Sequence, residues 1–303
     1  MKAQDKSHIE IQKILNRRGE EQIKSSISYD ECEKIILTAA SDLGVIRNDG
    51  RRGAAFGPSC IINAFKKFAC HLKDNKKIQL LEIPQSHLSF NQLQQEENEA
   101  IKLVLSAKDR THICHLGGGH DHIYPLIKAL TEHFKKKIHI INIDAHLDTR
   151  DDEFYHSGTP FRQIMRELKD VRLSQIGIQD ISNIPSNWNK MNMSVHRLSD
   201  LTALTKNFTN YDEPLIEKIL NINSREITVF SIDLDAICGH EFSSVSAVNA
   251  QGMPLHFVKE MLAFYLKTVE QNIVGLYEYN PMFDDLAAKD AKVCADLMNM
   301  VLI

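Results

Sequence analysis

The feature that most constrains the fold is the alternation of short β-rich runs with helix-length segments along the 303 residues. The runs are rich in Ile, Val and Leu, and the longer segments between most of them carry apolar residues at helical spacing. Strands that alternate with helices favour a parallel sheet covered on both faces. The expected strands are residues 34–39, 78–83, 111–116, 137–143, 171–178, 194–198, 226–232 and 272–277.

This pattern predicts a single α/β domain over residues 28–303, built as a three-layer α/β/α sandwich around a mainly parallel sheet of about eight strands. The sequence contains no internal repeat, low-complexity stretch or linker-like break that would divide the domain. Residues 1–27 are polar and are expected to form a peripheral segment. Two long loops, 41–57 and 146–160, are expected over the surface of the domain.

Charge and composition exclude several classes of partner. The chain has 36 basic and 40 acidic residues, a net charge of −4, and therefore no sign of the basic face that nucleic-acid binding needs. No window approaches the ~18 consecutive apolar residues of a membrane span, and the first residues lack the apolar core of a signal peptide. The six cysteines show no C-x-x-C pairing. A cytoplasmic protein with reduced thiols is expected.

Polar side chains cluster where three of the expected strands end. An open parallel sheet binds its ligands beyond the carboxyl ends of the strands. Two of these strand ends carry D-A-H-L-D and D-L-D, whose side chains begin on one face because side chains alternate along a strand. The third leads into G-G-G-H. The candidate ligands are His120, Asp144, His146, Asp148, Asp233 and Asp235.

These six side chains are expected to hold metal ions. Each motif alone has an ordinary explanation, as a chance D-x-D, a solvated loop or a capped turn. Together, four carboxylates and two imidazoles at one edge would repel one another or stay unsatisfied without cations. Four carboxylates with two neutral histidines balance two divalent ions, and the oxygen-rich set favours manganese. The sequence therefore predicts a centre with two Mn²⁺ ions per subunit.

In this order, the motifs resemble those of the ureohydrolases, the family of arginase, agmatinase and formimidoylglutamase, from about residue 34 onward. The resemblance implies a hydroxide that bridges the metals and attacks the C=N carbon of a guanidinium or amidine. Asp148 would relay the proton that the leaving nitrogen needs. One ion would be held by His120, Asp144, Asp148 and Asp233, and the other by Asp144, His146, Asp233 and Asp235.

Two more residues match positions of the family's motifs. Glu278, in G-L-Y-E-Y-N-P, matches the glutamate that anchors the nitrogen cation of the substrate, although a salt-bridged carboxylate at a strand end is the alternative. Ser157 occupies the place where arginases carry a proton-shuttle histidine, and the sequence S-G-T-P-F is similar to that of formimidoylglutamases. His156, one residue earlier, is either a substitute shuttle or a loop-stabilising residue.

Charge distinguishes the possible substrates. N-formimidoyl-glutamate carries two carboxylates, arginine carries one with an ammonium group, and agmatine carries none. A dicarboxylate needs arginine-type partners, because the guanidinium fork pairs with carboxylates. Arg150 follows the ligand Asp148 closely and is expected to bind one carboxylate. Arg47 and Arg51, in a loop that resembles R-N-x-G-R-x-G-A of formimidoylglutamases, are candidates for the second.

The predicted reaction is therefore the hydrolysis of N-formimidoyl-L-glutamate to L-glutamate and formamide, a step of histidine breakdown. The nearest alternative is another ureohydrolase that acts on a guanidino compound and releases urea. A catalytically silent relative that keeps the metals is a third possibility. The resemblance also implies a homo-oligomer.

Overall fold

A computed structural model describes residues 22–28, 32–70, 77–84, 89–107, 112–188 and 191–303. Its sheet has nine strands in the order β1-β3-β2-β4-β9-β8-β5-β6-β7, and every pair of neighbours is parallel. The strands are β1 (Ile27–Ser28), β2 (Lys34–Ala39), β3 (Ile78–Ile83), β4 (His112–Gly117), β5 (Ile138–Ile143), β6 (Val171–Ile178), β7 (Met193–Arg197), β8 (Ile227–Asp233) and β9 (Asn272–Tyr277).

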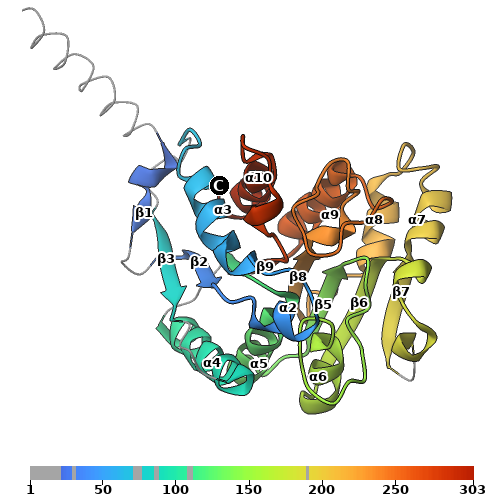
Figure 1. The fold of residues 1–303 in the computed structure, drawn as a ribbon, viewed down its shortest axis with the longest axis horizontal. Helices are drawn as coiled ribbons and strands as arrows, with labels where there is room; N and C mark the ends of the chain where they lie inside the picture. Colours follow the sequence, from blue (N-terminus) through green and yellow to red (C-terminus); the bar gives the residue numbers. More distant parts are fainter. Residues whose placement is uncertain (1–21, 29–31, 71–76, 85–88, 108–111, 189–190) are drawn as a thin grey trace, which may run out of the picture.

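Helices cover both faces of this sheet, so the predicted three-layer α/β/α architecture is confirmed (Figure 1). One face carries α3 (Gly57–Phe65), α7 (Leu198–Leu204), α8 (Glu213–Leu220), α9 (Leu255–Thr268) and α10 (Lys289–Leu302). The other carries α4 (Phe90–Ala107), α5 (Ile123–His133) and α6 (Pro160–Glu167). None of the helices within the described ranges has the length and apolar character needed to cross a bilayer.

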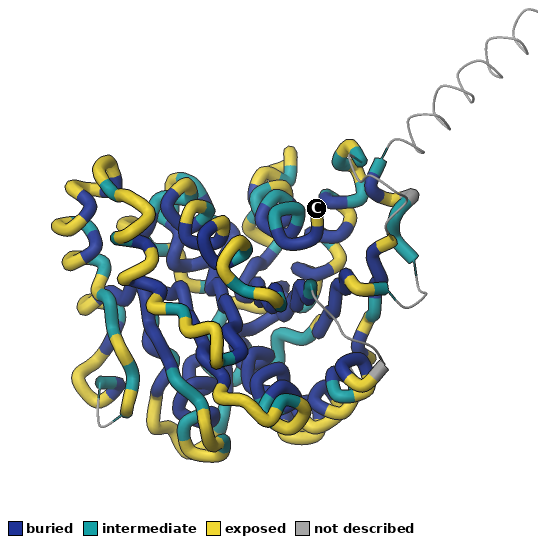
Figure 2. The backbone as a smooth tube through the Cα atoms, turned by 180° about the vertical axis from the view of Figure 1, so that it is seen from behind, coloured by how far each residue is buried: buried dark blue, intermediate teal, exposed yellow. Residues whose placement is uncertain are grey.

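The core is divided by the sheet into two apolar layers. Ile138 and Ile140 of β5 pack into the layer under α4, α5 and α6, whereas Ile141 and Ile143 pack into the layer under α3, α9 and α10. Burial on both faces explains why these strands read as nearly continuous apolar runs. Figure 2 shows the resulting buried centre of the molecule, with the exposed residues on the outer helices and loops.

The eight expected strands are all present, with ends that agree to within one residue. The ninth, β1, has only two residues and offers no readable period. The expected loop 41–57 contains two short helices, α2 (Leu43–Arg47) and η2 (Ala54–Phe56), and is therefore less irregular than predicted. Of the N-terminal segment 1–27, residues 1–21 lie outside the described part of the chain. Ile23 is buried in the core, so packing begins before residue 28.

Besides η2, six short 3₁₀ helices are present in the described part of the chain, and two of them follow strands that lead to candidate ligands. They are η1 (Ile23–Ser25), η4 (His120–His122), η5 (Asp180–Ser182), η6 (Pro185–Trp188), η7 (Leu234–Ala236) and η8 (Pro281–Phe283). The order β4-β9-β8-β5 places four consecutive strand ends side by side at the centre of the sheet. These four ends form the floor of the candidate site.

Candidate metal centre and active site

Four neighbouring strands bring the candidate residues together. His120 follows β4, Asp144 follows β5, Asp233 ends β8, and Glu278 follows β9. The segment after β5 also carries His146 and Asp148, and η7 carries Asp235. All six predicted metal ligands therefore lie at the carboxyl edge of one sheet, as the strand-end argument required.

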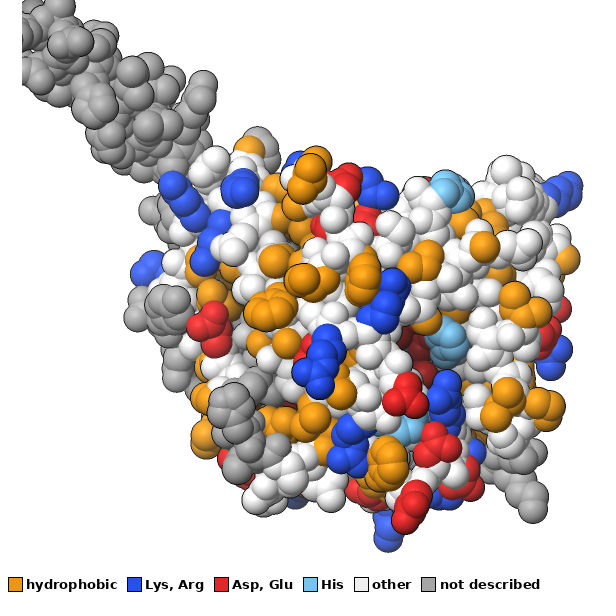
Figure 3. Space-filling model, in the orientation of Figure 1, with side chains coloured by type: hydrophobic (Ala, Val, Ile, Leu, Met, Phe, Trp, Pro, Cys, Tyr) orange, Lys and Arg blue, Asp and Glu red, His pale blue; other side chains and the backbone are white. Residues whose placement is uncertain are grey.

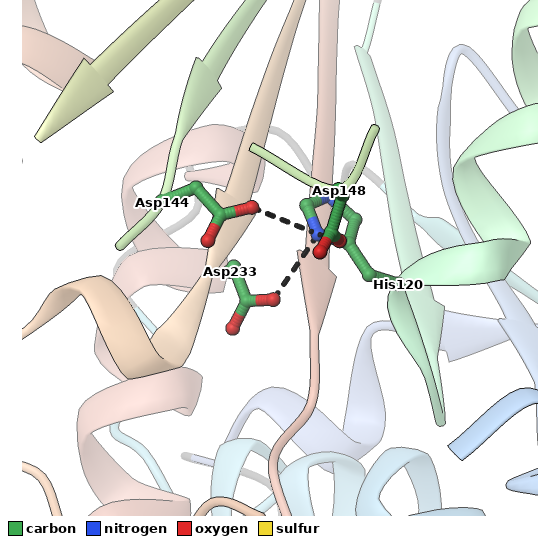
Figure 4. A group of neighbouring side chains, drawn as sticks. All are labelled: His120, Asp144, Asp148 and Asp233. Atoms are coloured by element: carbon green, nitrogen blue, oxygen red, sulfur yellow. Dashed lines mark ion pairs between the residues drawn. The ribbon is translucent and has the colours of Figure 1, made fainter. Parts of the chain in front are cut away.

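The first group of ligand atoms surrounds one nitrogen of His120. Its Nδ1 lies 3.0 Å from Asp148 Oδ2, 3.1 Å from Asp233 Oδ2 and 3.2 Å from Asp144 Oδ2. Figure 4 shows the three carboxylates pointing toward the imidazole from different segments of the chain. These four residues have ligand atoms that all lie within 4.8 Å of one another, close enough for a single cation.

The contact made by the other ring nitrogen of His120 leaves Nδ1 as the nitrogen that is available to a metal ion. Nε2 lies 3.0 Å from Ser231 Oγ, whereas Nδ1 is buried and has no hydrogen-bond partner among the described residues. A ligating histidine commonly donates its second N–H to an outer partner in this way. Burial alone would lower the pKa of His120, but the surrounding carboxylates raise it well above its ordinary value. The nitrogen therefore lies where positive charge is strongly favoured.

A second group shares one carboxylate with the first. His146 Nδ1 lies 2.9 Å from Asp235 Oδ2 and 3.7 Å from Asp144 Oδ1. The ligand atoms of Asp144, His146 and Asp235 again lie within 4.8 Å of one another. Asp144 is the residue common to both groups. Asp233 belongs to the first group, and its Oδ1 accepts the backbone N–H of Asp235 at 3.0 Å, so its predicted contact with the second ion stays a prediction.

The electrostatics of the two groups fit divalent cations. Burial and the neighbouring Asp233 raise the pKa of Asp235 to about 8, and burial and Asp144 raise that of Asp148 to about 6. Asp235 Oδ1 is buried without a hydrogen-bond partner in the described part of the protein. These carboxylates repel one another, and oxygen-rich sets with imidazole are suited to hard divalent metals such as Mn²⁺. The residues present therefore fit the predicted metal pair.

Manganese is expected to stabilise the folded protein. For protein treated with a chelator, a free Mn²⁺ concentration of ~100 times the dissociation constant of one site should add ~2.7 kcal/mol to the free energy of unfolding. In a chain of this length that corresponds to a rise in Tm of roughly 4 °C. Differential scanning calorimetry with and without Mn²⁺ measures the shift, and an unchanged Tm would contradict a metal site here.

Two of the site residues have left-handed backbone conformations. Asp148 has φ 50° and Glu278 has φ 69°, values that non-glycine residues rarely adopt. Glu278 is held there by two bonds: its N–H donates to Gly118 O at 3.0 Å, and its Oε1 accepts the N–H of His120 at 2.9 Å. Such conformations concentrate at functional sites because the surrounding structure must enforce them. These two bonds hold the carboxylate of Glu278 next to the backbone of the candidate ligand His120.

A cavity of about 270 Å³ opens above the two ligand groups. Figure 3 shows a recess in this face of the molecule, with acidic side chains inside it beside a histidine. Of the residues predicted to bind the substrate, Arg150, Ser157 and Glu278 line the cavity. Arg150 Nη1 donates to Asn48 Oδ1 at 2.7 Å, and Asn48 Nδ2 donates to Ser157 Oγ at 3.2 Å. One wall of the cavity is therefore a hydrogen-bonded set that contains a guanidinium group.

The structure does not bring Arg47 and Arg51 to this cavity. The guanidinium of Arg47 lies between the rings of Phe90 and Phe154, at 4.7 and 4.8 Å from their centroids. Arg51 stacks on Phe283 and donates to the carbonyl oxygens of Val245 and Ser246. Their neighbours in the loop, Asn48, Asp49 and Gly50, line the cavity instead. The loop that carries the motif therefore borders the cavity through residues other than these two arginines.

His156 makes its contacts within its own loop. Its Nε2 lies 2.8 Å from Asp152 Oδ2, and its Nδ1 accepts the N–H of Gly158 at 3.1 Å. It is not among the residues that line the cavity. Of the two alternatives left open by the sequence, these contacts favour the loop-stabilising residue over the proton shuttle.

Sequence reasoning missed several polar residues of the cavity. Ser182, Asn183 and Asn187 follow β6, and Ser246 lies in the loop after η7. Asn183 is a structural partner of the metal segment, because its Oδ1 accepts the N–H of Leu147 at 2.8 Å. The strand-end rule applies to β6 as well, but asparagine and serine are too common in loops to stand out.

Most of the described chain matches one known family of enzymes. The family model of arginases, described as "Arginase family", matches residues 33–303. The chain therefore belongs to the arginase family.

Within that family the chain is similar to formimidoylglutamases. It is 31% identical over 255 residues to the formimidoylglutamase of Klebsiella pneumoniae (strain 342), covering 82% of this chain and 79% of the relative. It is 30% identical over 274 residues to that of Salmonella typhi, covering 88% and 83%.

Solved structures share the fold. The formiminoglutamase of Trypanosoma cruzi, solved with Mn²⁺, has a TM-score of 0.77 at 22% identity and covers 92% of this chain and 97% of its own. The formimidoylglutamase of Bacillus subtilis has a TM-score of 0.79 at 20% identity, covering 92% and 90%. A hypothetical agmatinase from Burkholderia thailandensis has a TM-score of 0.75 at 19% identity, covering 91% and 86%. The arginase-like fold expected from the sequence is thus confirmed.

Proposed function

We propose that this chain is a manganese-dependent formimidoylglutamase, which hydrolyses N-formimidoyl-L-glutamate to L-glutamate and formamide. The observation that carries the proposal is the pair of ligand groups that share Asp144 beneath a cavity walled by Glu278 and Arg150. This arrangement offers a metal pair, an anionic partner for an amidinium and a cationic partner for a carboxylate within one cavity of about 270 Å³.

Membership of the arginase family and the formimidoylglutamase relatives indicate a hydrolase of carbon–nitrogen bonds in linear amidines. His120, Asp144, Asp148 and Asp233 would hold one Mn²⁺, and the second would be held by Asp144, His146 and Asp235, with Asp233 as the additional ligand that the family resemblance implies. When bound, the metal pair supplies Lewis-acid activation of water near neutral pH. The chemistry that the side chains themselves supply is binding, orientation and proton transfer.

Each side chain in the cavity then has a distinct role. Glu278 is buried beside the ligands and binds the positively charged nitrogen of the amidine, which orients its carbon toward the metal groups. Asp148 has its carboxylate at the cavity surface and transfers a proton to the leaving nitrogen, because that nitrogen is a poor leaving group until it is protonated. Arg150 binds a carboxylate of the substrate from the part of the cavity lining that it shares with Asn48.

A second candidate function is supported by one acidic residue. Asp49 lines the same cavity as Arg150, and among the described lining residues Arg150 is the only arginine. An α-amino acid with a free ammonium group would pair with Asp49 while its carboxylate pairs with Arg150. N-formimidoyl-glutamate has no free ammonium group and carries two carboxylates. Asp49 therefore favours a guanidino amino acid that releases urea, whereas the relatives described above are formimidoylglutamases.

A panel of substrates decides between the two functions. The protein loaded with Mn²⁺ is incubated separately with N-formimidoyl-glutamate, arginine, agmatine and guanidinobutyrate, and formamide and urea are measured. Formamide from the first compound alone is the expected result. Urea from any of the other three without formamide from the first would overturn the substrate assignment, while the metal centre would stand.

Arg150→Ala is expected to raise the KM for a carboxylate substrate by about 10- to 150-fold, because a charge-assisted hydrogen bond contributes ~1.5–3 kcal/mol. The kcat should change much less, since Arg150 is not in either ligand group. Steady-state kinetics on the substrate that the panel identifies measure both constants. An unchanged KM would exclude Arg150 from carboxylate binding.

Asp49→Asn is the variant to compare with Arg150→Ala, because it removes a negative charge from the lining of the same cavity. For a dicarboxylate it should leave KM unchanged or lower it, because a repelling carboxylate has been removed. For a substrate with an ammonium group it should raise KM. The sign of the change therefore distinguishes the two candidate functions independently of product analysis.

A further inference from the structure

A buried tyrosine lies directly behind the first group of metal ligands. Tyr277 is the last residue of β9, and its ring stacks on the imidazole of His120 with centroids 5.1 Å apart and an interplanar angle of 24°. Phe161 meets the same imidazole edge-on, at 5.2 Å and 89°. The ring of His120 is thus in contact with two aromatic rings, and that of Tyr277 is the one nearly parallel to it.

The position of Tyr277 in the sheet reinforces this contact. The strand β9 runs between β4 and β8, and Tyr277 is the register partner of Asp233. It also precedes Glu278 in the chain. Tyr277 is therefore adjacent to two of the first group's ligands, one by stacking and one by strand pairing, and to the proposed substrate anchor by a peptide bond.

Two glycines leave the space that this ring occupies. A Cβ at Gly117 would lie 2.7 Å from Tyr277 Cδ1, and a Cβ at Gly275 would lie 2.3 Å from the Tyr277 hydroxyl. Real Cβ atoms do not approach other atoms this closely, and neither glycine has a positive φ that would explain its presence otherwise. The sequence of β4 and β9 is therefore adapted to the tyrosine side chain.

A buried polar chain holds the hydroxyl of Tyr277. It lies 2.9 Å from His115 Nδ1, and His115 Nε2 lies 3.2 Å from Glu97 Oε1. Glu97 Oε2 lies 2.6 Å from His122 Nδ1, and His122 Nε2 lies 2.9 Å from Ser41 O. The Glu97 carboxylate, on α4, thus contacts a histidine with each of its oxygens. All of these side chains are buried.

The Glu97 carboxylate lies at the centre of this chain, between the two histidines. His122 has a polar partner at each ring nitrogen, with Glu97 Oε2 at Nδ1 and Ser41 O at Nε2. Burial alone would raise the pKa of Glu97, but His122 holds it below its ordinary value. The contact of the Tyr277 hydroxyl with His115 Nδ1, behind which Glu97 lies, restricts the orientation of the ring.

We infer that Tyr277 is a positioning residue of the metal centre: the chain Glu97–His115 holds its ring against His120, and this contact sets the affinity of the ion bound by the first ligand group. The inference rests on the proposed manganese centre. It assigns to the first group a support that the second lacks, because no described contact joins Tyr277 to His146 or Asp235.

The test measures Mn²⁺ affinity at each group separately, by isothermal titration. His146→Ala leaves the first group as the main site, and His120→Ala leaves the second. Adding Tyr277→Leu to His146→Ala should weaken Mn²⁺ binding by about 10- to 100-fold, the usual effect of losing a support behind a metal ligand. Adding it to His120→Ala should change nothing. Tyr277→Phe keeps the ring and loses the bond to His115. In the His146→Ala background it should weaken Mn²⁺ binding by a smaller factor than Tyr277→Leu, and Glu97→Gln should do the same.

Tyr265→Leu is the matched control. Tyr265 is also fully buried, and its hydroxyl donates to the backbone oxygens of Thr228 and Ile273, at 2.9 and 3.0 Å. It should lower stability without changing Mn²⁺ affinity at either group. Equal affinities with and without Tyr277→Leu and Tyr277→Phe would overturn the inference, as would equal losses at both groups. Wild-type protein that binds no Mn²⁺ would instead overturn the proposed function.

Discussion

Asp144→Ala is expected to remove both manganese ions and to lower kcat by ~10³-fold or more, the effect of losing several kcal/mol of charge stabilisation. Among the residues that the structure describes, Asp144 is the one that belongs to both ligand groups, with Oδ2 facing His120 and Oδ1 facing His146. A single truncation therefore deletes a ligand of each ion. Elemental analysis of the purified variant gives the metal content, and kinetics at saturating substrate give kcat.

The control for this variant is Asp200→Ala, which removes an exposed carboxylate on α7. It should bind metal and turn over substrate like the wild-type protein. An Asp144→Ala variant that retains two manganese atoms per chain would contradict the sharing of Asp144. Retention of one atom would mean that the two groups bind independently, which the overlap of their ligand atoms does not support.

The parallel sheet could be predicted because its strands are buried on both faces. Runs such as Ile138–Ile143 are apolar at every position but one or two, and their length separates them from helices. The strand β1 could not be predicted, because two residues carry no period. The helix α2 escaped prediction because its five residues, including Gly44, form little more than one turn and carry no side-chain cap.

The clustering of the six candidate metal ligands could be predicted, because each lies at or just beyond the end of a strand and histidine and aspartate have few structural uses at buried positions. Arginines are different, since the long side chain finds partners that the sequence does not reveal. Arg47 reaches two aromatic rings, one of them on α4, more than forty residues away in the sequence. A loop motif restricts which residues approach a site, but it does not determine the direction of each side chain.

The support behind His120 was also beyond sequence reasoning. Tyr277 and His115 read as ordinary residues of buried strands, and Glu97 as one acid of a polar helix. Only the pairing of β4 with β9 and the packing of α4 bring them together. The cytoplasmic location and the homo-oligomeric state expected from the sequence stay predictions, since both concern the surroundings of the chain and not its internal contacts.

Glu278→Gln is expected to lower kcat/KM for an amidine substrate by about 30- to 150-fold, because a buried hydrogen bond to a charged group contributes ~2–3 kcal/mol. Glutamine keeps an oxygen that can accept the N–H of His120, so the left-handed turn at this position should persist. Glu278 belongs to neither ligand group, so both manganese ions should be retained. Kinetics and metal analysis on the same preparation test both expectations.

Glu241→Gln provides the same substitution outside the cavity. Glu241 Oε2 accepts the N–H of Leu255 at the start of α9, a backbone contact comparable to that of Glu278. Since it lies away from the cavity lining, its kcat/KM should equal that of the wild type. If Glu278→Gln also kept full kcat/KM, the negative charge of Glu278 would have no role in binding the substrate cation. Asp49 would then be the carboxylate of the cavity lining, outside the ligand groups, that could bind this cation. Loss of manganese from Glu278→Gln would instead mean that its hydrogen bond to the His120 backbone maintains the metal ligand, which makes its role structural.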